Sequence, residues 1–153
     1  MASRRGQIEM TDGEVRAFLG EQMVMQCATV GPRGLPHMVP LWYVAEDIEL
    51  IGWTYAKSQK ARNLERDPRA TIGIEDGVQY HELRGVMFEC DVQVERDAER
   101  VEGYGLRLFE RYSGGLAPEI REMVAKQAPK RIGLRFVPSR VVSWDHRKLG
   151  GAY

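Results

Sequence analysis

The stretch that decides the fold is TYAKSQKARNLERDPRATI, residues 54–72. Its first residues end an aromatic, β-branched run, and Ser58 then provides a good N-cap for a short helix over 59–66. The DPR triplet at 67–69 ends that helix, because the residue before a proline disfavours the helical region. From residue 70 onward apolar and polar residues alternate, which is typical of a half-buried strand. The stretch therefore predicts a strand, a basic turn, a short helix and a second strand.

The segments before this stretch predict an antiparallel meander. Apolar runs separated by a Gly-Pro turn and an acidic turn give three strands, at residues 23–30, 35–45 and 48–56. Pro36 and Pro40 cannot donate hydrogen bonds to a ladder, which argues for a bulge or a partly unpaired edge near residues 40–42. Further upstream, Thr11 and Glu14 form a capping-box pattern that predicts a helix to about Gly20.

The segments after the stretch add strands and two helices. Alternation predicts strands over 84–95 and 131–138, with a further strand at 140–144, and helical spacing predicts helices over 97–112 and 118–128. Six or so antiparallel strands with small helices at the corners make the chain mainly β, of α+β class. Such strands favour a closed or nearly closed barrel, because closure removes exposed strand edges.

Composition limits the chain to one domain and excludes some partners. The 153 residues, 43% of them apolar, suit a single unit over 1–153, with residues 1–10 expected to be a flexible end. Lys plus Arg equals Asp plus Glu at 22 each, so no overall field favours nucleic acid or an anionic membrane. No apolar segment is long enough for a membrane helix, and no secretory signal is evident, so we expect a cytoplasmic protein.

The cysteines and histidines indicate neither a metal site nor a catalytic triad. Cys27 and Cys90 each lie in an apolar segment without a Cys or His at ligand spacing, so both are predicted to be buried thiols. The three histidines are scattered, and none has a Ser or Cys nucleophile at a recognisable motif distance. We assign no catalytic residue from the sequence.

The basic turn suggests an anion site. The first N–H groups of the 59–66 helix have no partner within the helix, and the macrodipole adds about half a positive charge there. Lys57, Ser58 and Lys60 would surround a phosphate placed at that end with ammonium groups and a hydroxyl. The alternative is a solvated face in which the basic residues of 57–69 are neutralised by Glu65 and Asp67.

Aromatic residues flank this turn and leave a second choice open. Trp42, Tyr43, Trp53 and Tyr55 lie on the two strands that precede it. Ring planes beside an anion pocket suit a flat ring system that carries a phosphate. The alternative is that these rings fill the core or form a dimer contact, which is the commoner fate of large aromatic side chains.

The same residues carry a resemblance to a known family. The pattern S-x-K-x-x-N-L-x-x-D-P-R is satisfied by Ser58, Lys60, Asn63, Leu64, Asp67, Pro68 and Arg69. It resembles the split β-barrel flavin and deazaflavin oxidoreductases, a superfamily that includes the pyridoxamine 5′-phosphate oxidases. The likeness runs from Thr11 to the tail SWDHRKLGG at 143–151 and is closest to the actinobacterial branch that uses a deazaflavin.

The resemblance implies an antiparallel split β-barrel of the FMN-binding type, as a homodimer with two cofactor sites at the subunit interface. Lys57, Ser58 and Lys60 would then hold the cofactor phosphate beside Asn63 of the same motif. The backbone of Pro40, Leu41 and Trp42 would border the ring, and Trp53, Thr54 and Tyr55 would line its floor. Three residues would approach from the partner chain: Trp144, Arg147 and Lys148.

Two positions depart from the family pattern. Gln59 stands where many FMN-binding members carry an Arg, which weakens the case for tight FMN retention. The Arg-x-His pair with which true pyridoxamine 5′-phosphate oxidases grip their substrate is not evident in the tail, which speaks against that activity.

The resemblance predicts an oxidoreductase in which bound coenzyme F420, or alternatively FMN, passes hydride to a small or medium organic acceptor. The cofactor supplies the difficult chemistry, so no strong acid or base need appear in the sequence. One alternative is a non-catalytic carrier or sensor that holds a flavin, haem or lipid-like ligand on the same barrel. Another is single-stranded nucleic-acid binding by the basic, aromatic residues of 42–69, against which the zero net charge speaks.

Overall fold

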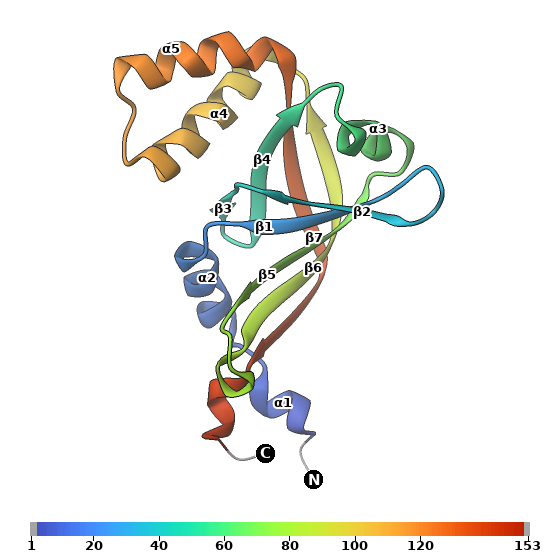
Figure 1. Ribbon diagram of the computed structural model, residues 1–153, viewed down its shortest axis with the longest axis vertical. Helices are drawn as coiled ribbons and strands as arrows, with labels where there is room; N and C mark the ends of the chain where they lie inside the picture. The colour runs from blue at the N-terminus through green and yellow to red at the C-terminus, as the bar shows by residue number, and fades with distance from the viewer. Residues whose placement is uncertain (1–2, 152–153) are drawn as a thin grey trace.

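The computed structural model describes residues 3–151. Its centre is a seven-stranded antiparallel sheet, in the order β2-β1-β5-β6-β7-β4-β3, that curls into a half-open barrel (Figure 1). The strands are β1 Met25–Val30, β2 Pro36–Leu41, β3 Val44–Glu46, β4 Glu49–Tyr55, β5 Arg69–Asp76, β6 Arg84–Glu95 and β7 Arg131–Asp145.

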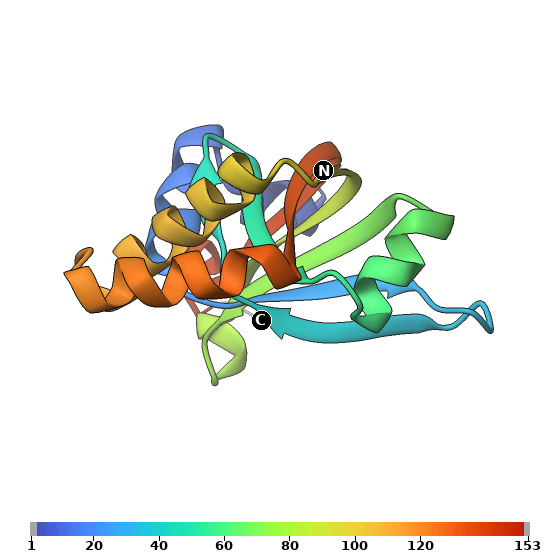
Figure 2. The same cartoon turned by 90° about the horizontal axis from the view of Figure 1, so that it is seen from above.

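Short helices cover the ends and corners of this sheet. They are α1 Arg4–Ile8, α2 Asp12–Glu21, α3 Gln59–Arg66, α4 Ala98–Ser113 and α5 Pro118–Gln127, with 3-10 turns η1 Tyr80–Glu82, η2 Ala128–Lys130 and η3 His146–Leu149. Seen from above, the α4–α5 hairpin and the β1–β2 hairpin project to opposite sides (Figure 2). The predicted capping box is confirmed, since Thr11 and Glu14 exchange hydrogen bonds at the start of α2.

The helix predicted over 59–66 and the α+β barrel class are confirmed, but two strand predictions are wrong. The segment 35–45 is not one strand: it divides into β2 and β3, on opposite edges of the sheet. The expected edge at β2 is confirmed, and its ladder with β1 continues through Pro40 without a bulge. Residues 131–138 and 140–144 belong to the single strand β7, which bends at a register shift opposite Glu89 and Cys90.

The division of the predicted strand links the two edge strands of the half-open barrel. Because β2 and β3 are the two outer strands and are consecutive in the chain, Trp42 and Tyr43 between them cross from one edge to the other. The crossing passes close to β4 at Gly52, where a Cβ atom would lie 3.2 Å from the carbonyl oxygen of Trp42. A glycine is needed there for the two backbones to approach.

Helix α4 provides the hydrogen-bond partners that the crossing lacks. The Tyr112 hydroxyl accepts from the Tyr43 N–H at 3.0 Å, and Arg111 donates to the Tyr43 carbonyl at 2.5 Å. Arg111 also donates to carbonyls at the end of α2, those of Leu19, Gly20 and Gln22. One arginine therefore satisfies groups on α2 and on the crossing, which buried backbone requires.

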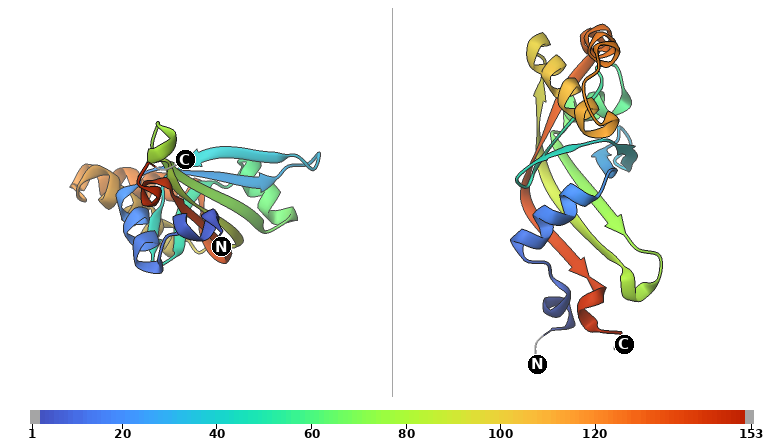
Figure 3. Two further views of the ribbon diagram at one scale, coloured as in Figure 1. Left: turned by 90° about the horizontal axis from the view of Figure 1, so that it is seen from below. Right: turned by 90° about the vertical axis from the view of Figure 1, so that its left-hand side faces the viewer.

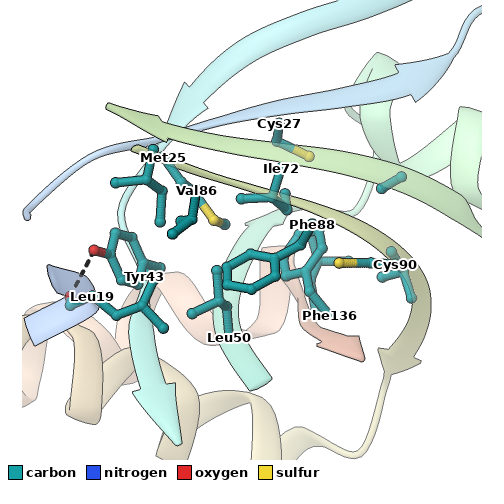
Figure 4. Close-up of a cluster of buried hydrophobic side chains, with 14 of the residues drawn as sticks. Leu19, Met25, Cys27, Tyr43, Leu50, Ile72, Val86, Phe88, Cys90 and Phe136 are labelled. Carbon is teal, nitrogen blue, oxygen red and sulfur yellow. Dashed lines mark hydrogen bonds between the residues drawn. The ribbon is translucent and has the colours of Figure 1, made fainter. Parts of the chain in front are cut away.

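Two apolar clusters stabilise the fold. The larger fills the barrel, and Figure 4 shows Tyr43 within it, donating its hydroxyl to the Leu19 carbonyl at 2.7 Å. Cys27 and Cys90 are buried free thiols, as predicted, and burial raises the pKa of each to about 12. The smaller cluster joins Trp53 to α4 and α5; Gly105 of α4 leaves room for the Trp53 ring, which a Cβ atom would approach to 2.4 Å.

The amino-terminal segment packs against the far end of the sheet. Met10 is buried, and its N–H donates to Ser143 Oγ at 3.0 Å. Both ends of the described chain therefore lie together, away from α4 and α5 (Figure 3). The flexibility expected for residues 1–10 stays a prediction, and residues 1–2 lie outside the described part.

Replacing Arg111 should destabilise the whole protein. In Arg111→Ala, four backbone carbonyls lose a donor, and we expect the free energy of unfolding to fall by about 2 kcal/mol. Urea unfolding with an unchanged slope measures this loss. The control is Arg121→Ala on the exposed side of α5, expected to change stability by less than about 0.5 kcal/mol. Equal midpoints for the two variants would contradict the role of Arg111.

Candidate functional site: the basic corner of β4, α3 and β7

The turn from β4 into α3 places a serine, a threonine and a lysine side by side. Ser58 Oγ accepts from the Ala61 N–H at 3.1 Å, which confirms its predicted role as the N-cap of α3. Lys60 Nζ donates to Thr54 Oγ1 at 3.1 Å, and Thr54 Oγ1 lies 3.4 Å from Ser58 Oγ. The three predicted residues therefore form one polar cluster at the start of the helix.

Lys60 is a buried cation that lacks a carboxylate partner. Its side chain is only 6% exposed, and within residues 3–151 its one hydrogen bond goes to Thr54. Burial lowers the pKa of Lys60; Cys27 acts in the opposite direction, and the positive charge of Arg131 contributes a smaller lowering. A buried ammonium normally has a charged partner, because removing a charge from water is costly. Lys60 is thus poised to accept an anion.

Arg131 is a second cation at this corner, and the sequence analysis missed it. It is the first residue of β7 and pairs with Tyr55 in the β4–β7 ladder. Its guanidinium carbon lies 4.0 Å from the Tyr55 ring centroid and 4.7 Å from that of Trp53. No local sequence signal marks Arg131, because β4 and β7 are far apart in sequence. Only the pairing of β7 with β4 in the sheet would have placed it at this corner.

The solvated-face alternative holds for most basic residues of the turn and helix, because Lys57, Arg62, Arg66 and Arg69 are exposed, and it fails for Lys60, which is buried. Asp67 pairs with Arg69 at 2.7 Å, as that alternative requires. Glu65, however, pairs with Arg96 on the other side, at 2.8 Å. In the described part of the chain, no carboxylate lies within ion-pair distance of the remaining basic residues of the segment, namely Lys57, Lys60, Arg62 and Arg66. The corner keeps its positive charge.

Asn63 positions the helix. It is fully buried, and its Nδ2 donates to Thr29 Oγ1 on β1 at 3.0 Å. Its Oδ1 accepts from Gln59 Nε2 at 2.8 Å and from Arg66 Nη2 at 3.2 Å. Both lone pairs of that oxygen are used, so the structure shows Asn63 fixing α3 against the barrel, with Gln59 turned back along the helix.

The aromatic residues divide between core and surface. Tyr43 is core, and Trp53 belongs to the cluster beneath α4, so the core alternative is right for both. Trp42 and Tyr55 stay about half exposed. The Trp42 ring stacks on Tyr112 at 4.3 Å between centroids, with 11° between planes. The Trp42 carbonyl adjoins Gly52 of β4, the strand that carries Thr54, whereas Pro40 and Leu41 pair with β1.

The carboxyl-terminal residues predicted for the site lie elsewhere in this chain. Trp144, Arg147 and Lys148 belong to the end of β7 and to η3, at the opposite end of the sheet from α3 (Figures 1 and 3). Arg147 forms two hydrogen bonds to Asp145, at 2.9 and 2.7 Å. Lys148 Nζ contacts Glu14 at 2.6 Å and donates to the Glu9 carbonyl at 2.7 Å. One copy does not bring these residues to the basic corner.

Three other features of residues 3–151 bear on the choice of site. No group of three His, Cys, Asp or Glu side chains could hold a metal ion, and no helix is long and apolar enough to cross a membrane. A hollow of about 620 Å³ lies on the outer face of the sheet, between the β1–β2 hairpin and β6. None of the residues predicted for the site lines it.

Comparisons with known proteins agree with this architecture. The family model described as pyridoxamine 5′-phosphate oxidase matches residues 11–145. The crystal structure of the conserved hypothetical protein Rv2991 from Mycobacterium tuberculosis is 42% identical, with a TM-score of 0.90, covering 97% of this chain and 93% of that one. No curated protein matches the chain.

Two more distant structures share the fold alone. An F420 reductase is 22% identical, with a TM-score of 0.64, covering 82% of this chain and 94% of that one. The heme storage protein HutZ from Vibrio cholerae is also 22% identical, with a TM-score of 0.68, covering 86% and 93% of the two chains.

Removing the buried charge should stabilise the ligand-free protein. Lys60→Met keeps the apolar stem and removes the ammonium, so we expect the free energy of unfolding to rise by about 1 kcal/mol at neutral pH. The pKa of Lys60 is lower in the folded than in the unfolded state. The free-energy cost of burying the charged side chain therefore has its full value at pH values below the folded-state pKa. That cost disappears as pH rises toward the unfolded value.

Urea unfolding of both proteins at several pH values checks this expectation. The gain should be largest near neutral pH and should shrink in alkali. The exposed neighbour supplies the control, since Lys57→Met should change stability by less than about 0.5 kcal/mol. A Lys60→Met protein less stable than the parent at pH 7 would show that the ammonium is well compensated after all.

Proposed function

The chain belongs to the pyridoxamine 5′-phosphate oxidase family, and from this premise we propose that it is an oxidoreductase. The proposed cofactor is coenzyme F420, with FMN as the alternative, and the chemistry that such a cofactor supplies is hydride transfer to a small or medium organic acceptor. The F420 reductase among the similar structures supports this choice, as a likeness of fold.

The observation that carries the proposal is the uncompensated charge of Lys60. A phosphate at the amino end of α3 would meet the Lys60 ammonium, the free N–H groups of the first turn and the side chains of Lys57 and Ser58. Arg131 Nε is shut off from solvent and has no partner among the described residues. Both cations suit an anionic group, so the residues present fit a phosphorylated cofactor.

The other residues of the corner would orient and shield the ring. Thr54 holds the Lys60 ammonium in place, and Asn63 anchors α3 to β1, so the phosphate seat is rigid before any ligand arrives. The backbone of Pro40, Leu41 and Trp42 would border the ring, and β4 from Trp53 to Tyr55 would form its floor. With Trp53 packed beneath α4, that floor is backed by apolar core, which excludes water.

Two side chains bear on the choice of cofactor and reaction. Gln59 stands where many FMN-binding members have Arg. It donates a hydrogen bond to Asn63 and adds no positive charge to the proposed phosphate site, which favours the deazaflavin over FMN. Arg147 is bonded twice to Asp145, so it is already occupied by a carboxylate in this chain. We therefore propose that pyridoxamine 5′-phosphate is not the substrate.

The complete site is proposed to need a second copy of the chain. Trp144, Arg147 and Lys148 would reach the partner's basic corner, since they lie at the opposite end of their own sheet. Exposed apolar side chains near the β1–β2 hairpin, Leu35 and Met38, are suited to burial in such an interface. Sedimentation should give twice the chain mass of 17.4 kDa, and a monomer would refute this arrangement. A cytoplasmic location stays a prediction.

A non-catalytic carrier of a flavin, haem or lipid-like ligand is the second candidate. HutZ, a heme storage protein, has the same fold, which keeps this class open. Turnover separates the two classes: purified protein with reduced F420 is mixed with quinones, enones and tetrapyrroles, and cofactor oxidation is followed. Binding without oxidation of the cofactor would favour the carrier.

Lys60→Ala should weaken cofactor binding while leaving the fold intact. Loss of the ammonium removes a charge-assisted contact to the phosphate, so we expect the dissociation constants for oxidised F420 and for FMN to rise several-fold or more. Titration followed by the protein's tryptophan fluorescence measures both constants.

The control for this variant is Lys126→Ala, which removes an exposed lysine paired with Glu122 on α5. It should bind both cofactors with the affinity of the parent protein. Unchanged affinity in Lys60→Ala would show that the phosphate does not bind at this corner.

A further inference from the structure

Arg131 is the remaining charged group near the site, and no part of the sequence pattern assigns it a role. It is half-buried at the first position of β7, where the β4–β7 ladder sets it opposite Tyr55. The rings of Tyr55 and Trp53 contact its guanidinium, and Nη2 donates to Gln127 Oε1 at 2.7 Å. Ring contacts fix the position of the group but satisfy no N–H donor, and within residues 3–151 the Nε donor has no acceptor.

The ion pairs of the described residues show that Arg131 lacks a carboxylate partner. Other partly buried arginines of the described chain have anionic or carbonyl acceptors: Arg84 pairs with Glu21 and Asp76, Arg135 pairs with Glu46 and Glu49, and Arg111 donates to four backbone carbonyls. Arg131 pairs with neither Asp nor Glu. Burial lowers its pKa, in the direction expected for a guanidinium that loses water without gaining an anion.

Arg131 and Lys60 are close enough to affect each other. Burial is the largest cause of the lowered pKa of Lys60, and the charge of Arg131 adds to the lowering, while Cys27 opposes it; no carboxylate contributes to the shift of Lys60 or of Arg131. The backbone also joins their segments, because the Ala56 N–H at the turn into α3 donates to the Lys130 carbonyl at 2.9 Å. Two partly dehydrated cations with open donors therefore converge on one corner of the barrel.

We infer that Arg131 is a further anion-binding residue, which acts with Lys60 on the phosphate group of the bound cofactor. This inference rests on the proposed function. A guanidinium offers planar, paired donors that suit phosphate oxygens, and here Trp53 and Tyr55 hold it in place in advance. A phosphate between the two cations removes their mutual repulsion and satisfies the orphaned Nε.

The test compares ligands that differ in the phosphate alone. Affinities for FMN and riboflavin, and for F420 and its phosphate-free core, are measured with the parent protein, Arg131→Gln and Arg131→Lys. We expect Arg131→Gln to weaken FMN and F420 at least tenfold and to change the phosphate-free ligands less than twofold. Arg131→Lys, which keeps the charge but not the fork, should show an intermediate loss. Arg62→Gln, on the exposed face of α3, should bind like the parent.

A combined variant tests whether the two cations share one phosphate. If they do, the loss in Lys60→Ala with Arg131→Gln is smaller than the product of the two single losses. Equal losses for ligands with and without phosphate would mean that Arg131 merely supports the fold, and would overturn the inference. If affinity for the phosphorylated ligands falls in Lys60→Ala but not in Arg131→Gln, the inference is overturned and the proposed function stands. If affinity falls in neither variant, the inference and the proposed function are both contradicted. Should Arg131→Gln fail to fold, the phosphate-specific loss in Arg131→Lys decides.

Discussion

The hydrogen bond between the Lys60 ammonium and the Thr54 hydroxyl is the interaction on which the basic corner depends. It holds the buried positive charge of Lys60, which has no carboxylate to neutralise it. Such an arrangement is unfavourable for folding, and proteins retain it where a ligand completes it. The surrounding contacts keep the charge in place: Ser58 caps the helix that carries Lys60, and Asn63 fastens that helix to β1. Stability and binding are therefore expected to oppose each other at this residue.

Barrel closure determines where this corner lies. The chain crosses from β2 to β3 through Trp42 and Tyr43, and this crossing sets the Trp42 backbone beside Gly52 of β4. Arg111 and Tyr112 of α4 satisfy the polar groups that the crossing leaves without ladder partners. The same helix receives Trp53 at Gly105. Helix α4 thus supports the wall of the proposed site without contributing to the basic corner itself.

Much of the fold could be predicted from local pattern, because its causes are local. The caps at Thr11 and Ser58, the alternation of β6 and the apolar spacing of α4 and α5 each follow from residues near in sequence. The crossing could not be predicted, since a run of apolar residues looks the same whether it stays on one edge or changes edges. The proline signal pointed to the right place, but it indicated a bulge as readily as an edge.

The site was predictable in part for the same reason. Lys57, Ser58 and Lys60 share one turn, so sequence alone could propose them as a group, and the resemblance supplied the remainder of the proposal. Arg131 escaped because its neighbours Trp53 and Tyr55 lie more than seventy residues away in the chain. Asn63 belongs to the motif, yet its bonds show a positioning role that no pattern reveals. The roles proposed for Trp144, Arg147 and Lys148 would require a second copy of the chain.

The most direct test of the account is the pKa of the Lys60 ammonium, measured by NMR of the labelled lysine side chain with and without cofactor. The account predicts a pKa below the ordinary value of 10.5 in the free protein, and a clear rise when F420 or FMN binds, because the phosphate stabilises the charged form. Phosphate-free riboflavin should produce no such rise. An ordinary pKa in the free protein, unchanged by the phosphorylated cofactor, would contradict the central claim.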